Sequence, residues 1–317
     1  MRTILSVIML VSVVLTGCVK KEVVETEVEI GPDVTELLVS PETVKSIDLE
    51  PAWSNVVPLA PTEQLESIKL VENRLYAFTS ENYVMSMDKV ESRPVVAFSV
   101  APAGFTINGW AMSGDKIYSV ISSDLVEIDW RSGTRTRSKR LGFAPICPPV
   151  SNRDFYYVAG VDKRLHVLQS SDMIEVFEVA GDDDAEMTDV IASDDAVIFA
   201  TRKGLVTAML PDRPVQLWKF SAARVVNAPM IRNGAVIYFS SEDTNIYAVD
   251  ARRGKLIWKY LTAALLKEAP RVTNRFVYQH VDGRGLLVID KASGELAWRL
   301  TEGKDLLAET ESGVYVL

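Results

Sequence analysis

Apolar and polar residues alternate most clearly between Asn245 and Tyr260, in the sequence NIYAVDARRGKLIWKY. From Ile246 to Asp250 the alternation has the period of two that places successive side chains on opposite faces of a β-strand. Asp250 and Gly254 supply the chemistry of a tight turn, because an aspartate accepts hydrogen bonds from backbone N–H groups two residues on and a glycine enters positive φ without a Cβ penalty. A second strand carrying Trp258 follows, so the stretch predicts a β-hairpin.

The same pattern returns at nearly constant intervals along the chain. Asp290, Gly294 and Trp298 repeat the three key positions 40 residues later, in the sequence LVIDKASGELAW. Seven repeats at a spacing of 40 or 41 residues predict an all-β propeller, in which each repeat forms one four-stranded antiparallel blade. The position of the turn aspartate recurs at Asp48, Asp88, Asp129, Gln169, Leu210, Asp250 and Asp290.

The outer strand of most repeats carries an aromatic residue for which we predict a structural role. A tryptophan buries a large area and can fill the wedge between neighbouring blades while its indole N–H bonds to a neighbouring turn. Stacking on a ligand is the alternative, and the fixed position of these residues in the repeat favours packing. The outer-strand aromatics are Phe98, Phe177, Trp218, Trp258 and Trp298. The residues expected to form the turns and docking contacts are Asp48, Asp88, Asp129, Asp250, Asp290, Gly133, Gly254, Gly294, Trp218, Trp258 and Trp298.

The repeat spacing also predicts how the ring closes. One more step beyond Asp290 would pass the end of the chain, so the C-terminus contributes only two strands, Leu306–Thr310 and Gly313–Leu317. The segments Val44–Leu49 and Trp53–Leu59 are expected to supply the other two. A blade shared in this way covers both terminal sheet edges, which would otherwise pair with other chains. We therefore predict a seven-bladed propeller over residues 38–317, since an eight-bladed ring would need about forty more residues.

The first residues are typical of a secretory signal. Arg2 precedes an apolar run, Ile4–Leu15, which is too short to cross a bilayer. The run ends in LTGC, which resembles the bacterial lipobox that is cleaved before a lipid-bearing cysteine; an ordinary signal peptide with a chance cysteine is the alternative. We expect residues 1–17 to be a lipoprotein signal peptide and Cys18 to be lipidated.

Residues 18–37 mix glutamates with valines, and we expect them to tether the lipid to the propeller. The alternating segment Glu25–Ile30 within them could instead form a short edge strand. No aspartate follows Cys18, so the inner-membrane retention signal of enteric lipoproteins is missing. By that analogy the protein is expected at the outer membrane, facing the periplasm and held to the membrane only through its lipid.

Composition narrows the classes of function. Of the 317 residues, 48% are hydrophobic and 24% charged, which excludes wholesale disorder. The formal net charge of −9 would repel a phosphate backbone, so nucleic acid is not expected as a partner. Only two histidines, His166 and His280, are present, and they leave little room for histidine-based catalysis or a histidine-rich metal site. Cys147 is the only cysteine besides Cys18 and is expected to be a buried, inert thiol.

The repeats at Asp250 and Asp290 resemble the tryptophan-docking repeats of the pyrroloquinoline-quinone-like propellers. That superfamily includes quinoprotein dehydrogenases and the BamB-type lipoproteins of the outer-membrane β-barrel assembly machinery. With its lipobox and short tether, the chain is most similar to the BamB type. The resemblance implies a non-catalytic scaffold in the cell envelope with a protein partner, and no cofactor. Known relatives of that type have eight blades, so the seven predicted here depart from their pattern.

Motifs for catalysis or metal binding are not found in the sequence, and we predict no catalytic, cofactor-binding or metal-binding residue. The acidic stretch Gly181–Asp189 lacks calcium-loop spacing and is expected to be a solvated loop. The basic stretch Arg131–Arg140 is expected to be a solvent-facing outer strand, although it could pair with an acidic partner or anionic headgroups. Two further functions stay open: a carbohydrate- or small-molecule-binding propeller with a pocket lined by Trp110 and Trp130, and a quinoprotein-type enzyme. We expect a monomeric ring.

Overall fold

The computed structural model describes residues 57–71, 73–91, 93–113, 116–310 and 313–317, which form strands and loops and no helix. Six sheets in this part of the chain have four antiparallel strands each, hydrogen-bonded in chain order. The first two sheets contain β1 (Leu65–Val71), β2 (Arg74–Thr79), β3 (Tyr83–Asp88) and β4 (Pro94–Ser99), then β5 (Ile107–Ser113), β6 (Lys116–Ile121), β7 (Asp124–Asp129) and β8 (Arg135–Arg140).

The third and fourth sheets contain β9 (Val150–Ser151), β10 (Phe155–Ala159), β11 (Arg164–Gln169) and β12 (Glu175–Ala180), then β13 (Met187–Ala192), β14 (Val197–Thr201), β15 (Leu205–Met209) and β16 (Gln216–Ser221). The fifth and sixth contain β17 (Ile231–Asn233), β18 (Val236–Ser240), β19 (Asn245–Asp250) and β20 (Leu256–Leu261), then β21 (Arg271–Val272), β22 (Phe276–Val281), β23 (Gly285–Asp290) and β24 (Leu296–Leu300).

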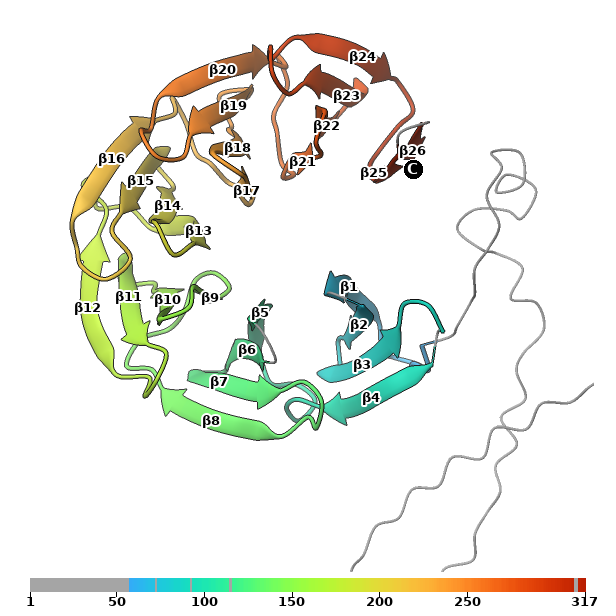
Figure 1. Cartoon of the computed structure of the whole chain (residues 1–317), viewed down its shortest axis with the longest axis vertical. Helices are drawn as coiled ribbons and strands as arrows, with labels where there is room; N and C mark the ends of the chain where they lie inside the picture. Colours follow the sequence, from blue (N-terminus) through green and yellow to red (C-terminus); the bar gives the residue numbers. More distant parts are fainter. Residues whose placement is uncertain (1–56, 72, 92, 114–115, 311–312) are drawn as a thin grey trace, which may run out of the picture. The chain divides into compact units, whose positions relative to one another are not determined.

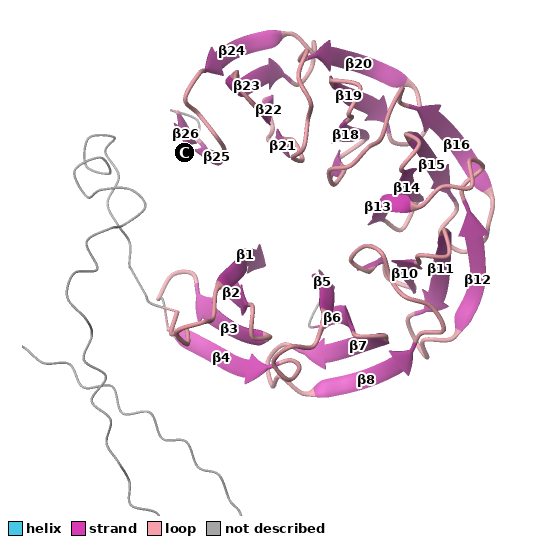
Figure 2. Ribbon diagram, turned by 180° about the vertical axis from the view of Figure 1, so that it is seen from behind, coloured by secondary structure: helices cyan, strands magenta, loops and turns pink. Residues whose placement is uncertain are grey.

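The sheets follow one another around a common centre, with the first strand of each sheet innermost and the fourth outermost (Figure 1). Figure 2 shows the same order of blades from behind. A seventh sheet has two strands within the described residues, β25 (Leu306–Glu309) and β26 (Val314–Val316). The predicted all-β, seven-bladed propeller is confirmed, as is the prediction that the C-terminus contributes a strand pair.

The N-terminal half of the closing blade stays a prediction. The segment Val44–Leu49, with Asp48, lies outside the described residues. Of Trp53–Leu59 only residues 57–59 are described, and they are not assigned to a strand.

The two middle strands of the four-stranded sheets are largely buried, because neighbouring sheets pack face to face against them. In β19 the four residues from Ile246 to Val249 are all buried, and in β14 every residue is. The outer strand is different: in β20, Trp258 is buried while Leu256 and Ile257 are exposed. Continuous apolar runs therefore mark the middle strands, and alternation marks the outer one.

The hydrophobic core is divided into layers between adjacent blades. One layer joins Ile198 and Val206 of the fourth sheet to Ile237 and Phe239 of the fifth. Five further layers join the other neighbouring sheets in the described part of the chain. Each layer holds two blades in a fixed relation, so stability is distributed around the ring instead of residing in one centre.

A β-bulge recurs where the outer strand pairs with the third strand. In the fifth sheet the register shifts between Ala248 and Val249, directly beside the pair formed by Ala248 and Trp258. The other four-stranded sheets shift at the equivalent point. A bulge increases local twist and redirects side chains. It therefore sets the direction in which the outer strand presents its docking residue.

Candidate functional site

The turn between the third and fourth strands is closed by an aspartate in four of the described blades. The Oδ1 atom of Asp129 accepts hydrogen bonds from the backbone N–H groups of Arg131, at 2.9 Å, and Ser132, at 2.8 Å. These bonds hold the pKa of the Asp129 carboxyl below its ordinary value. Equivalent pairs of bonds are formed by Asp88, Asp250 and Asp290.

Three of these turns end in a glycine at positive φ. The φ angles of Gly133, Gly254 and Gly294 are 68°, 65° and 75°. A Cβ atom on Gly254 would lie 2.5 Å from the indole of Trp218, and one on Gly294 would lie 2.5 Å from the indole of Trp258. Glycine is therefore required by the backbone conformation and also by the close approach of the neighbouring blade's tryptophan.

Each of these two tryptophans joins its own blade to the next. The Nε1–H of Trp218, on β16, donates to the carbonyl oxygen of Ala251 at 3.0 Å. The Nε1–H of Trp258, on β20, donates to that of Lys291 at 2.9 Å. Both acceptors directly follow the turn aspartate of the next repeat, and both indoles are 7% exposed. The indoles thus fill the blade junction and satisfy a turn carbonyl.

Trp298 holds the equivalent place on β24. It is partly buried and meets Tyr278 edge to face, with ring centroids 6.3 Å apart. By the repeat spacing its partner turn is the one at Asp48, which is not among the described residues. The docking of Trp298, and its part in closing the ring, stays a prediction.

Phe98 differs from the other outer-strand aromatics in register. It pairs with Val84, whereas the residue at the tryptophan position of β4 is Val96, which pairs with Ser86. A Cβ on Gly133 would nevertheless lie 2.4 Å from the Phe98 ring. The aromatic ring therefore reaches the next turn from two residues further along the strand. The spacing shows the same shift, because Phe98 stands ten residues after Asp88 and Trp258 stands eight residues after Asp250.

The second blade has an arginine at the tryptophan position. Arg137, on β8, donates from Nη2 to the carbonyl oxygen of Ser170 and from Nη1 to that of Ser171, both at 2.6 Å. Ser170 follows Gln169, the turn position of the next repeat, so the guanidinium bonds to the same backbone position that the indoles use. The prediction that the basic stretch is a solvent-facing outer strand is correct for most of β8. It is wrong for the Arg137 side chain, which turns toward the next blade.

The charge of Arg137 is balanced by Glu127, which is 1% exposed. Arg137 donates to Glu127 Oε2, and Lys116 Nζ lies 3.1 Å from Oε1. Tyr156 of the next blade donates to Oε2 at 2.8 Å, and Thr136 donates to Oε1 at 2.7 Å. Burial alone would raise the pKa of Glu127, but these hydrogen bonds outweigh it and lower the pKa to about 2.

The acidic stretch Gly181–Asp189 is partly neutralised by basic side chains. Lys219 Nζ lies 3.0 Å from Asp182, and Arg202 Nε lies 2.7 Å from Glu186. Asp189 differs, because burial raises the pKa of its carboxyl to about 7, while it accepts a hydrogen bond from the N–H of Met230 at 2.7 Å. The stretch is therefore an ion-paired loop that runs into β13 at Met187, and Asp189 contacts the next blade through Met230.

The aromatic residues proposed for a ligand pocket are used in packing. Trp130 is 8% exposed and meets Tyr76 edge to face at 6.3 Å between centroids. Trp110 stacks on Phe78 at 5.1 Å. Both belong to the layer between the first and second blades. Cys147 is also buried, and burial raises the pKa of its thiol to about 12, in line with an unreactive cysteine.

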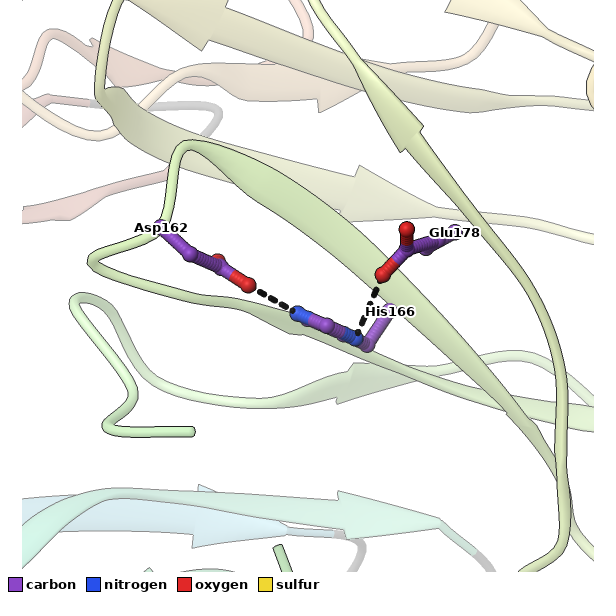
Figure 3. A group of neighbouring side chains, drawn as sticks. All are labelled: Asp162, His166 and Glu178. Atoms are coloured by element: carbon purple, nitrogen blue, oxygen red, sulfur yellow. Dashed lines mark hydrogen bonds and ion pairs between the residues drawn. The ribbon is translucent and has the colours of Figure 1, made fainter. Parts of the chain in front are cut away.

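One cluster that could hold a metal ion surrounds His166. Asp162, His166 and Glu178 each offer a ligand atom, and these atoms all lie within 4.8 Å of one another. The carboxylates of Asp162 and Glu178 approach the imidazole from opposite ends (Figure 3). His166 is buried, with 4% of its surface exposed.

Comparison with known proteins supports the same kind of propeller. The profile of the family described as outer membrane protein assembly factor BamB matches residues 202–316. BamB of Yersinia pestis is 27% identical over 116 residues, which are 33% of this chain and 30% of that protein. BamB of Moranella endobia (strain PCIT) is 30% identical over 113 residues, which are 32% of this chain and 29% of that protein. The matched segments thus span less than a third of the length of these relatives.

Solved structures extend the likeness over most of the chain. The crystal structure of BamB from Moraxella catarrhalis has a TM-score of 0.61 and 13% identity, and the match covers 78% of this chain and 80% of that one. Residues 202–316 thus resemble BamB in sequence, and the chain shares the propeller fold of BamB over most of its length. The propeller domain of Myceliophteria thermophila Cps50 (Swd1) matches with a TM-score of 0.59, 13% identity, and coverage of 76% and 88%. At such identities the structures show the fold alone, and the fold is shared by proteins of different names.

Cys18, the signal peptide 1–17 and the tether 18–37 lie outside the described residues, so their roles stay predictions. Among the residues that are described, none form a helix able to cross a membrane.

The sequence reasoning missed Arg137 with Glu127, and the cluster around His166. A signal for the first was available: Arg137 stands eight residues after Asp129, the spacing that separates Asp250 from Trp258. No comparable repeat position marks His166.

Proposed function

We propose that the chain is a membrane-anchored periplasmic lipoprotein whose propeller acts as a non-catalytic protein-interaction scaffold in outer-membrane protein assembly. The observation that carries the proposal is the similarity of residues 202–316 to proteins described as outer membrane protein assembly factor BamB. The lipobox ending in Cys18 supports anchoring by lipid at the outer membrane. The expected partner is a protein of the β-barrel assembly machinery.

The arrangement of the ring suits such a role. Blade-to-blade contacts fix the positions of the loops, and loops held by a rigid frame make good docking surfaces. Two large apolar side chains are exposed where β20 leads into β21: Leu261, the last residue of β20, is 63% exposed, and Leu265, in the connection, is 57% exposed. The hydroxyl of the buried Thr262 holds this connection in place, because its Oγ1 lies 2.8 Å from the carbonyl oxygen of Thr244 and 3.0 Å from that of Ala264 and its one hydrogen can be donated to either. Exposed apolar residues on a fixed loop favour contact with a protein.

Affinity purification from detergent-solubilised envelopes tests the proposal. The wild-type chain is expected to recover a subunit of the β-barrel assembly machinery, and the double variant Leu261→Ser/Leu265→Ser is expected to recover at least tenfold less. Val215→Ser is the matched control, because Val215 is an exposed apolar residue of another blade. Recovery of no specific partner by the wild type contradicts the scaffold role.

Anchoring has its own test. Cys18→Ser is expected to move the protein from the membrane fraction to the soluble periplasmic fraction and to abolish labelling with a palmitate analogue. Unchanged membrane association would contradict lipid anchoring while leaving the partner interaction open to its own experiment.

The absence of a quinone cofactor is tested by titration with pyrroloquinoline quinone and Ca²⁺, for which no spectral or thermal response is expected.

A further inference from the structure

His166 and two glutamates of the neighbouring strand converge on one side of the third blade. His166, on β11, pairs directly with Glu178, on β12, so their side chains lie on the same face of the sheet. Glu175 stands three residues from Glu178 and would point to the opposite face in a regular strand. A bulge lies between the pairs Val167–Phe177 and Leu168–Glu175, with Val176 as the extra residue. The extra residue returns the Glu175 side chain to the face that carries Glu178 and His166. Both carboxylates therefore face the imidazole.

The ring of His166 is held in one orientation. Phe143 stacks on it with centroids 3.5 Å apart and an interplanar angle of 9°. Its Nε2 lies 3.0 Å from Oδ2 of Asp162, in the hairpin before β11. Gly160 makes this approach possible, because a Cβ there would lie 2.3 Å from the Asp162 carboxylate. Because Phe143 stacks on the ring and Asp162 bonds to Nε2, the remaining ring nitrogen, Nδ1, points toward the two glutamates.

Two carboxylate oxygens lie close to Nδ1. Glu175 Oε1 lies 3.2 Å from Nδ1 and Glu178 Oε2 lies 3.7 Å from it. A tetrahedral ion bound at about 2.0–2.1 Å separates its ligand atoms by about 3.3 Å. Arg164 occupies only Oε1 of Glu178, which leaves Oε2 available. A ligand histidine that donates its other N–H to a carboxylate, as Nε2 does to Asp162, is the usual outer-shell arrangement of such sites.

We propose that His166 Nδ1, Glu175 and Glu178 bind one Zn²⁺ ion, with Asp162 as the positioning residue that orients the imidazole. One imidazole nitrogen and two carboxylate oxygens leave a fourth coordination position for water. Of the three carboxylates in this cluster, that of Glu178 is paired with the guanidinium of Arg164, and a divalent cation offsets the remaining negative charge. The ion links β11 to the outer strand β12 and is expected to stabilise the third blade.

Zinc binding by the full-length, chelator-treated protein tests the site. Isothermal titration with ZnCl₂ is expected to show one equivalent bound and a higher melting temperature. Glu175→Gln and Glu178→Gln should each lower the affinity at least tenfold, and Asp162→Asn should lower it by about 10- to 100-fold. Glu186→Gln, which alters a surface ion pair of the neighbouring blade, is the matched control and should leave the affinity unchanged.

A second readout does not depend on stability. The chain has only two histidines, so the nitrogen resonances of His166 and His280 are easily distinguished by NMR of ¹⁵N-histidine-labelled protein. Zinc is expected to shift Nδ1 of His166 and to leave His280 unchanged. The proposal is overturned if the wild type binds no zinc, if its affinity is the same in the Glu175→Gln/Glu178→Gln variant, or if Nδ1 of His166 does not respond.

Discussion

In the two halves of the described propeller, different side chains connect the outer strand of one blade to the turn of the next. In the C-terminal half, Trp218 and Trp258 dock on turns that have both aspartate and glycine. In the N-terminal half, Phe98 reaches its turn from a shifted register and Arg137 takes the tryptophan position. All four residues contact the turn of the next blade. Trp218, Trp258 and Arg137 each donate an N–H hydrogen bond to the backbone carbonyl of the residue that follows the turn position.

The two chemistries place different demands on their surroundings. An indole is neutral and can be buried with one hydrogen bond, whereas a guanidinium requires a counter-ion. Glu127 supplies that charge, and it is buried with four hydrogen-bonding or ion-pairing partners. The half that keeps tryptophan docking contains the segment that matches the BamB profile, residues 202–316.

The largest expected effect comes from removing a docking indole. Trp258→Ala should lower the free energy of unfolding by about 3–5 kcal/mol, because it leaves a large cavity at the blade junction and an unpaired carbonyl at Lys291. Urea denaturation followed by circular dichroism measures the change. Trp258→Phe, which keeps most of the ring volume, should lose less. A melting temperature unchanged by Trp258→Ala would remove the structural role of the tryptophan.

The ion-pair junction should be selectively sensitive to acid. The pKa of Glu127 is about 2 in the folded protein and near 4.5 when unperturbed, so its stabilisation is present above pH 4.5 and is lost as the pH falls toward 2. The loss amounts to about 3 kcal/mol. Stability measured at several pH values should therefore fall more steeply for the wild type than for Glu127→Gln. Parallel curves would show that Glu127 does not titrate as the junction requires.

Alanine substitutions at two glycines with nearly the same φ distinguish the cost of backbone strain from the cost of a side-chain clash. Gly254 has φ 65° and lies against Trp218, whereas Gly234 has φ 62° with nothing within 4 Å of an added Cβ. Gly234→Ala should cost about 1 kcal/mol for the left-handed conformation alone. Gly254→Ala should cost about 2 kcal/mol or more, because the indole must also shift. Equal losses in thermal denaturation would argue against close docking at Gly254.

The sequence was most informative where the determining chemistry is local. The turns at Asp250 and Asp290 could be predicted because the aspartate bonds to residues two and three positions on. The period of 40 or 41 residues then predicted seven blades, including β25 and β26. Local patterns of this kind do not depend on knowing the neighbouring blade.

The missed features depend on contacts distant in sequence or on irregular backbone. The eight-residue spacing after Asp129 marks Arg137 as the docking position, but its acceptor Ser170 lies 33 residues away in the next blade, so the local pattern does not show the contact. The bulge that brings Glu175 toward His166 leaves no mark in the alternation of side chains. Such features need the packed sheet before their side chains can be placed.

A double-mutant cycle on Glu127 and Arg137 tests the central claim most directly, namely that one docking position accepts either an indole or a charge-balanced guanidinium. Arg137→Met, Glu127→Gln and the double variant are compared with the wild type by equilibrium unfolding at pH 7. We expect a coupling free energy of about 2 kcal/mol, because Arg137→Met removes the guanidinium partner of the buried Glu127 and Glu127→Gln removes the counter-ion of the partly buried Arg137. A coupling near zero would contradict the account.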